Sequence, residues 1–332
     1  MTNLQTDIVL SSRVRLARNY EDLPFSLMET PGNATLCEQR TLNALSLENA
    51  DEGYTLYRMR EMNEPQKNVL AEKRLLSFDL VERCPMGSAF IHEEKQVSIM
   101  MNEEDHLRIQ AILRGQQPEK TAELVYQVED ALQKHVRFAF DARLGYLTAC
   151  PTNTGTGLRA SLMLHLPMLT LSKQMGAVNQ IVAKLGLTIR GIYGEGSEAL
   201  GNLYQVSNQA TLGRTEEELI EAVNAVAKQL IDMERNLREK ADRNDPVQLE
   251  DTISRSYGLL KYARRMSLKE FMLNWSRLRV GSALCRIPHS LEKIDALLEK
   301  AQDAHIMKWL GEEVQGETLN EARSQRIRKL LS

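Results

Sequence analysis

The chain has 332 residues, 42% hydrophobic and 26% charged, so it can bury a substantial core in one large or two smaller domains. Its net charge of −3 excludes a general attraction to nucleic acid or anionic membrane, so any anion site must be local. No run approaches the roughly 18 apolar residues that a membrane span needs.

The four cysteines, Cys37, Cys84, Cys150 and Cys285, form neither a metal-spaced pair nor a dense disulfide framework. That usage is typical of a reducing compartment. The N-terminus also lacks the basic and apolar regions of a signal peptide. We therefore expect a cytoplasmic protein with no metal held by its own side chains.

Residues 7–19 predict an extended segment in which Val14 and Leu16 alternate with Arg13 and Arg15. Both guanidiniums then lie on one face. Two planar forks side by side suit a polyphosphate, because each can bind oxygens bidentately. The alternative is a solvated edge strand with charges that prevent aggregation.

Residues 31–75 carry mixed helix and strand signals. Residues 34–47 have a weak helical stripe, 54–62 alternate like a strand, and 68–76 look helical. Lys73 and Arg74 add positive charge to this region.

Residues 96–113 predict a hairpin whose tip is Asn102-Glu103-Glu104-Asp105. Three consecutive carboxylates repel one another. The tip is therefore either a solvated acidic turn, or a general base with a partner carboxylate, or a metal site. Arg108 could counter that charge or bind phosphate.

Residues 118–134 predict an amphipathic helix with a proline in its first turn, and 138–147 predict a strand or hairpin arm. Residues 150–157 form a loop with two glycines and three threonines, which exposes backbone N–H groups and hydroxyls. From Leu158 to Leu166 strict alternation predicts a half-buried strand, which Pro167 ends. Alone, this segment also fits an ordinary loop with a buried cysteine.

A helix is expected over residues 167–185, a strand over 187–191 with Arg190 on its polar face, and a short strand over 203–207. Gly194 and Gly196 form a second glycine-containing loop. It lacks the spacing of a dinucleotide fingerprint, and the chain has no Walker phosphate loop.

Residues after about 210 show only helical signals. Helix starts are predicted at Thr215, Ser267, Ser290 and Thr318. We expect a sheet-containing domain over residues 7–232 and an all-helical domain over 233–332, the latter serving packing, dimerisation or partner binding.

Four strand-linked segments therefore present arginines, one hairpin tip presents carboxylates, and one loop presents a thiol. Converging arginines suggest a nucleotide polyphosphate, because phosphoryl transfer needs charge neutralisation, Mg²⁺ and positioning. Adjacent carboxylates suggest a nucleophile that must lose a proton.

Together these motifs resemble the phosphagen (ATP:guanido) kinases, the family of creatine and arginine kinases. The resemblance rests on Ser11-Ser-Arg-Val-Arg15, Asn102-Glu-Glu-Asp-His-Leu-Arg108, Cys150-Pro-Thr-Asn-Thr-Gly-Thr-Gly-Leu-Arg159-Ala and Arg190-Gly191, which occur in family order. The helical C-terminal extension and the sequence from Gly191 to Gly201 look most like the bacterial protein arginine kinases of the McsB type.

This resemblance implies an α+β fold, a large antiparallel sheet flanked by helices, followed by an all-helical C-terminal domain. It implies ATP and Mg²⁺ as cofactors, Glu104 as the base, Asp105 as its partner, and Cys150 in contact with the substrate guanidinium. It implies a nucleotide site made by Ser11, Ser12, Arg13, Val14, Arg15, Arg74, Arg108, Arg159, Ala160, Ser161, Leu162, Met163, Arg190, Gly191, Ile192, Tyr193, Gly194 and Glu195. A guanidinium has a pKa above about 12, so it becomes a nucleophile only when a carboxylate takes its proton.

Two positions depart from the family pattern. Arg74 stands where the family has a histidine that contacts nucleotide. Leu319-Asn320-Glu321-Ala322-Arg323-Ser324 stands where protein arginine kinases carry Arg-Asp-x-x-Arg-Ala, a pocket for phosphoarginine, so regulation through that pocket is not expected.

The expected function is phosphorylation of arginine residues in proteins, which would mark them for regulated degradation. The alternatives are a kinase for a free guanidino metabolite and a catalytically silent adaptor that binds nucleotide or phosphoarginine. By resemblance we expect a zinc-binding activator protein, a protease-coupled unfoldase and a homodimer, with neither nucleic acid nor membrane as a partner.

Overall fold

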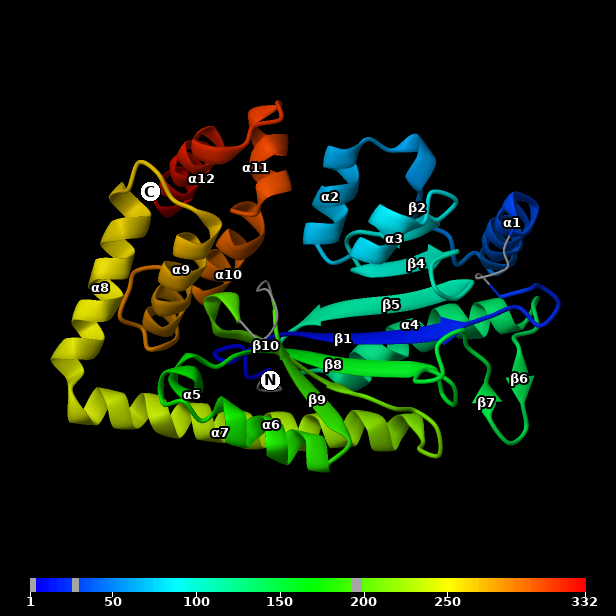
Figure 1. Cartoon of the computed structure of the whole chain (residues 1–332), viewed down its shortest axis with the longest axis horizontal. Coiled ribbons are helices and arrows are strands. Elements are labelled where there is room, and N and C mark those ends of the chain that lie inside the picture. The colour runs from blue at the N-terminus through cyan, green and yellow to red at the C-terminus, as the bar shows by residue number, and fades with distance from the viewer. Residues whose placement is uncertain (1–3, 26–29, 193–198) are drawn as a thin grey trace. The chain divides into compact units, whose positions relative to one another are not determined.

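The structure is a computed structural model and describes residues 4–25, 30–192 and 199–332. Its strands are β1 (Val9–Arg18), β2 (Thr55–Arg58), β3 (Ser88–His92), β4 (Val97–Met101), β5 (Leu107–Arg114), β6 (Phe140–Asp141), β7 (Gly145–Tyr146), β8 (Leu158–His165), β9 (Leu187–Gly191) and β10 (Leu203–Asn208). In the described part of the chain, eight of them form one sheet in the order β2-β3-β4-β5-β1-β8-β10-β9, while β6 pairs with β7 (Figure 1).

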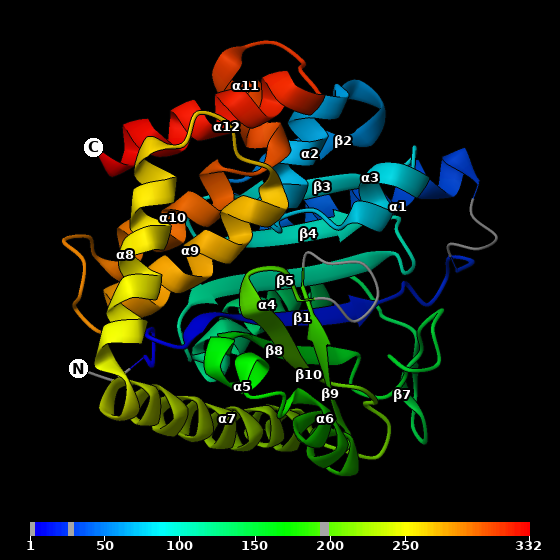
Figure 2. The same cartoon turned by 60° about the vertical axis from the view of Figure 1, so that its left-hand side comes forward.

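The helices are α1 (Pro31–Leu47), α2 (Glu64–Glu72), α3 (Phe78–Arg83), α4 (Pro118–Gln133), α5 (Pro167–Leu171), α6 (Met175–Lys184), α7 (Glu216–Asn244), α8 (Pro246–Tyr262), α9 (Leu268–Ala283), α10 (Leu291–Lys300), α11 (Asp303–Leu310) and α12 (Gly316–Leu331), with 3₁₀ turns at Met59–Glu61 and Leu200–Asn202. The neighbours along β2-β3-β4-β5-β1 all pair antiparallel. Figure 2 shows α8 to α12 grouped together. The expected antiparallel sheet flanked by helices, with a helical C-terminal region, is therefore confirmed.

The chain forms two compact units. The central unit comprises Ser11–Leu162 and Ser207–Asn224, and the C-terminal unit comprises Met1–Leu10, Met163–Val206 and Ala225–Ser332. Helix α7 is continuous through residue 232, so the domain boundary expected there stays a prediction.

Strand β1 forms because its apolar residues alternate. Val14 and Leu16 are fully buried, whereas Arg13 and Arg15, on the opposite face, are partly accessible. Strand β5 pairs antiparallel with β1 from Ser11 to Arg18, with Arg15 opposite Gln110 and Ala17 opposite Arg108. The alternation predicted from the sequence is thus confirmed.

The core of the C-terminal unit centres on α9, whose Phe271, Trp275 and Leu278 are fully buried. Trp275 Nε1 donates to the carbonyl of Ile294 in α10 at 2.8 Å, so its one polar group is satisfied. Ser290 caps α10 by accepting from the Lys293 amide, as predicted. Packing of α9 against α8 and α10 therefore organises the C-terminal helices.

A buried arginine from α9 anchors the segment that precedes β1. Arg279 is fully buried and donates to the carbonyls of Thr6 and Asp7 at 2.7 and 2.8 Å. Asp295 lies 2.7 Å from its Nε. Arg235 also pairs with Asp7. This network holds the start of the chain by charge-assisted bonds within the C-terminal unit.

Several expectations about element boundaries are wrong. Residues 167–185 form two helices, because Lys173 between them adopts a left-handed φ of 58°. Helix α12 begins at Gly316, ahead of the predicted cap at Thr318. The strand expected over 54–62 covers only Thr55–Arg58.

Strand β8 is buried on both faces in its second half, so the half-buried strand predicted from alternation is also wrong. Met163 and His165 lie on its polar face, yet both are buried. The His165 ring is hydrogen-bonded to Ser276 Oγ at 2.8 Å and contacts Trp275, so α9 covers it.

Two further expectations concern absences. All four cysteines lie in the described part of the chain, and no disulfide joins them. None of the described helices combines the length and apolar composition that crossing a membrane requires.

Replacing Arg279 by alanine should lower the free energy of unfolding by about 3–5 kcal/mol, because a buried charge network loses its central donor. Urea denaturation of the full chain measures this. Arg277→Ala, an exposed arginine on the same helix, should change stability by less than about 0.5 kcal/mol. Equal effects of the two substitutions would contradict the anchoring role.

Candidate active site

The site is built on one face of two neighbouring strands. In the antiparallel pairing of β1 with β5, residues opposite each other share a face. Arg108 lies opposite Ala17, which alternation places on the same face as Arg13 and Arg15. The sheet therefore aligns three guanidiniums from two segments about 90 residues apart.

Five guanidiniums act on one another here. Burial and the nearby charges of four arginines, Arg15, Arg74, Arg108 and Arg159, hold the pKa of Arg13 well below its usual range. Burial, reinforced by Arg108, Arg159 and Arg74, lowers the pKa of Arg15 to about 9, although Glu103 opposes this shift. No acceptor among the described residues takes the N–H of Arg15 Nε, which is buried. Positive charge gathered in this way favours the binding of a polyanion.

Arg74 joins this cluster through an unusual backbone conformation. It adopts a left-handed φ of 65°, and Gln110 Nε2 donates to its carbonyl at 2.7 Å. Its guanidinium donates to Ser11 Oγ at 3.0 Å. Arg74, the departure from the family pattern, thus adds positive charge beside Arg13.

The three carboxylates of the hairpin tip have different environments. Glu103 is buried, accepts from Ser77 Oγ at 2.7 Å and pairs with Arg108 at 2.5 Å. Burial raises the pKa of Glu103, and the Arg108 charge opposes that rise. Glu104 lies 3.6 Å from Arg108, and its side chain is 43% accessible. The tip thus presents one accessible carboxylate next to the arginine cluster.

Asp105 joins the hairpin tip to the cysteine loop. It is buried, and its Oδ1 accepts from Asn19 Nδ2 and from the amide of Ala149, both at 2.7 Å. Ala149 directly precedes Cys150, whose Sγ lies 3.1 Å from Thr152 Oγ1. The structure therefore brings the predicted base and the predicted thiol into one region, with Asp105 acting as the link.

Sequence reasoning missed Arg18, which supports the same loop from the apolar face of β1. It is fully buried, pairs with Glu129 at 2.5 Å and donates to the Thr156 carbonyl at 2.8 Å. Its guanidinium also lies over the Tyr146 ring, 3.5 Å from the centroid. The sequence did offer a signal, because the spacing of two residues places Arg18 on the same buried face of the strand as Val14 and Leu16.

The remaining predicted residues lie in several places. Ser12 is fully buried, donates to the Gly115 carbonyl and accepts from the Gln117 amide. Val14, Ala160 and Leu162 have side chains in the core, while Ser161 Oγ donates to the Arg13 carbonyl.

Some predicted residues belong to the C-terminal unit. Met163 is buried, Arg190 is exposed, Gly191 ends β9, and Ile192 packs against the core of that unit. Tyr193, Gly194 and Glu195 lie outside the described residues.

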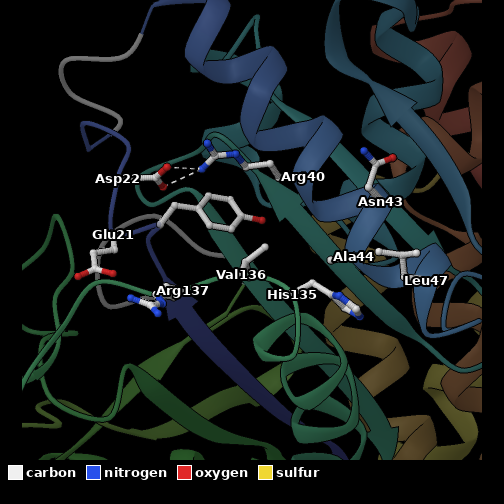
Figure 3. A pocket seen from close by; sticks show the side chains of 10 residues that line it. Glu21, Asp22, Arg40, Asn43, Ala44, Leu47, His135, Val136 and Arg137 are labelled. Carbon is white, nitrogen blue, oxygen red and sulfur yellow. Dashed lines mark hydrogen bonds and ion pairs between the residues drawn. The ribbon is translucent and has the colours of Figure 1, made fainter.

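A separate pocket of about 530 Å³ lies elsewhere on the central unit (Figure 3). Arg40 and Asp22 point toward each other there, 2.7 Å apart, and His135 and Leu47 line the same hollow. None of its lining residues belongs to the predicted site.

Arg323, where the resemblance implies a phosphoarginine pocket in protein arginine kinases, is used by the fold in this chain. It is buried and donates to the carbonyls of Ala301 and Met266, to Asn320 and to Asp303. These bonds use most of its five N–H groups. Arg323, the one arginine that remains of the motif, therefore has a structural role.

The fold and this arrangement define a class of protein. Residues 37–237 match the family described as ATP:guanido phosphotransferase, C-terminal catalytic domain. The chain belongs to this family and is a guanido phosphotransferase.

More particular similarities follow. Residues 246–332 match the protein-arginine kinase McsB C-terminal domain. A protein-arginine kinase of Caldanaerobacter subterraneus subsp. tengcongensis is 42% identical over 313 residues, covering 94% of this chain and 93% of the relative. A protein-arginine kinase of Bacillus velezensis is 46% identical over 279 residues, covering 83% and 77%.

Solved structures give the same fold. A lombricine kinase superposes with a TM-score of 0.62 at 29% identity, covering 71% of this chain and 68% of that one. A duplicated taurocyamine kinase from Schistosoma mansoni superposes with a TM-score of 0.64 at 24% identity, covering 95% and 48%.

Replacing Arg15 by methionine should weaken ADP binding about 10- to 100-fold, because a charge-assisted bond to phosphate is worth about 1.5–3 kcal/mol. Without nucleotide, the free energy of unfolding should stay equal or rise by up to about 2 kcal/mol, since one repelling charge is gone. Calorimetric titration and urea denaturation measure the two effects. Arg83→Met, on the exposed face of α3, serves as control.

The effect of Arg15→Met on the free energy of unfolding should depend on pH. The folded pKa of Arg15, about 9, lies below its unfolded value, so its charge destabilises the ligand-free protein fully below pH 9. Any stability gain of Arg15→Met should shrink as the pH rises above 9. A gain that grows with pH would contradict the repulsion.

Replacing Asp105 by alanine should lower kcat about 100-fold, because the hairpin tip and the cysteine loop lose their shared anchor. ADP affinity should be unchanged, which also reports an intact fold. Asp130→Ala on the exposed face of α4 is the matched control. A kcat equal to that of the wild type for Asp105→Ala would contradict the proposed linking role of Asp105.

Proposed function

We propose that this protein transfers the γ-phosphoryl group of ATP to the guanidinium of arginine residues in proteins. The observation that carries the proposal is the cluster of five guanidiniums beside the 103–105 tip, which Asp105 ties to the Cys150 loop. The many similar chains described as protein-arginine kinases support the substrate.

Phosphate recognition falls to Arg13, Arg15, Arg74, Arg108 and Arg159. Their positive charge is partly buried, so it interacts strongly with a polyphosphate and with the charge that develops during transfer. Glu103 holds Arg108 in place. The predicted contribution of Arg190 remains part of the proposal.

Mg²⁺ suits the site by its chemistry. Within the described residues, no group of three or more His, Cys, Asp or Glu side chains could hold a metal ion. Mg²⁺ commonly binds through substrate phosphates and water, which needs no cage of protein carboxylates. When bound, it would neutralise phosphate charge.

Glu104 accepts a proton from the substrate guanidinium as the nitrogen attacks phosphorus. A P–N bond forms, the P–O bond to ADP breaks, and the products are phosphoarginine, ADP and a proton. Cys150 contacts the guanidinium and keeps it facing the base.

The degradation-marking role, the zinc-binding activator, the unfoldase and the homodimer remain part of this proposal. Their support is the resemblance of the C-terminal region to the protein-arginine kinases. Arg323, being committed to the fold, supports the expectation that self-regulation by phosphoarginine is altered here.

The direct test mixes the chain with Mg·ATP and an arginine-rich protein, followed by mass spectrometry under non-acidic handling. Phosphoarginine on the protein is expected. In a parallel reaction with free arginine, phosphorylation of the free amino acid and not of the protein would instead indicate a metabolite kinase. Nucleotide binding without ATP turnover would indicate a silent adaptor.

Replacing Glu104 by glutamine should lower kcat by roughly 10²–10⁴, because the positioned base is lost. ADP affinity should remain within about twofold. Glu94→Gln, an exposed glutamate in the β3–β4 turn, should keep full activity. Comparable activity of Glu104→Gln and the wild type would eliminate Glu104 as the base.

A further inference from the structure

Asn19 lies directly after β1 and is 1% exposed. Its Nδ2 donates to Asp105 Oδ1 at 2.7 Å and to the Leu147 carbonyl at 3.1 Å. Its Oδ1 accepts from the His106 amide at 2.8 Å. Both N–H groups and the oxygen of the amide are therefore used, and the opposite orientation would set oxygen against two acceptors. One side chain thus joins the end of β1, the hairpin tip and the segment that leads to Cys150.

The His106 ring fixes the same junction from the hairpin. Its Nδ1 accepts from the Tyr20 amide at 3.0 Å, so Nε2 carries the proton and donates to the Pro24 carbonyl at 2.9 Å. Burial lowers the pKa of His106, which favours the neutral ring that this arrangement needs. The Asn19 side chain therefore binds the backbone of His106, and the His106 ring binds the backbone next to Asn19. We call this pair the Asn19–His106 clamp.

The clamp acts on the residue proposed as the base through its neighbours. Glu104 directly precedes Asp105, and its own side chain is 43% accessible. Its position therefore depends on how the backbone of the tip is held. Removing the Asn19 amide would take one donor from Asp105 and the bound oxygen from the His106 N–H. A displacement of reacting groups by about 1 Å can lower a rate about 100-fold.

We propose that Asn19 is a positioning residue for phosphoryl transfer, which fixes the hairpin tip so that the Glu104 carboxylate meets the substrate guanidinium. This inference rests on the proposed role of Glu104 as the base. Asn19 acts through Asp105 and through the backbone of His106. An amide suits this position because aspartate there would set a second carboxylate against Asp105.

The test measures ADP release by the wild type, Asn19→Asp and Asn19→Ala, with arginine in a protein as the acceptor. At about pH 8, Asn19→Asp should lower kcat about 100-fold, because the two carboxylates repel each other and the tip moves. Two carboxyl groups this close share a proton as the pH falls, which returns a donor to Asp105. The loss relative to the wild type should therefore shrink to about tenfold at about pH 6. Asn19→Ala should lower kcat by about 10- to 100-fold at both pH values, since alanine cannot titrate.

Two controls isolate residue 19. Asn43→Asp, at an exposed asparagine of α1, adds the same charge to the central unit and should keep the kcat of the wild type at both pH values. The affinity for ADP should stay within about threefold in all variants, which reports an intact nucleotide site. Asp105 and His106 face Asn19, and the charge of Asp22 acts on the His106 ring. All three are present in every variant, so each variant is compared with the wild type at the same pH.

The outcomes separate this inference from the proposed function. A kcat equal to that of the wild type in both variants overturns the positioning role, as does a loss in Asn19→Asp that is the same at both pH values. Loss of ADP binding in either variant also overturns it, because Asn19 would then serve the fold. A wild type that phosphorylates no arginine in proteins overturns the proposed function instead. Free arginine, if it is phosphorylated, then serves as the acceptor for the same comparison.

Discussion

Repulsion among guanidiniums on one sheet face is the constraint on which the site depends. The pairing of β1 with β5 places Arg13, Arg15 and Arg108 together, and Arg74 and Arg159 add their charges. Glu103 is buried beside them and pairs with Arg108 as a countercharge. The fold can retain this cluster because its strands are held by backbone hydrogen bonds. A bound polyphosphate would relieve the repulsion among the guanidiniums.

The chemistry depends equally on joining segments that are distant in sequence. Asp105 binds the Ala149 amide and so fixes the hairpin tip that carries Glu104 to the backbone beside Cys150. Arg18, on the opposite face of β1, donates to the Thr156 carbonyl at the other end of the cysteine loop. The proposed base and the proposed thiol contact are therefore positioned by buried carboxylate and guanidinium bonds. Such bonds hold reacting groups in place better than an exposed loop alone would.

Local periodicity explains what the sequence predicted. Alternation located β1, the β4–β5 hairpin, β8 and β9, because a strand repeats every two residues. The burial of His165 was not predictable, since its cover comes from Ser276 more than 100 residues later. The role of Arg18 was missed for the same reason, because its partner Glu129 lies 111 residues further along the chain.

The most direct test is a crystal structure of the protein with Mg·ADP, nitrate as a planar mimic of the phosphoryl group, and an arginine-containing peptide. The account predicts phosphate oxygens and nitrate within hydrogen-bond distance of Arg13, Arg15 and Arg159. It also places the peptide guanidinium against Glu104 and Cys150. Nucleotide bound away from the arginines, or a guanidinium out of reach of Glu104, would contradict it.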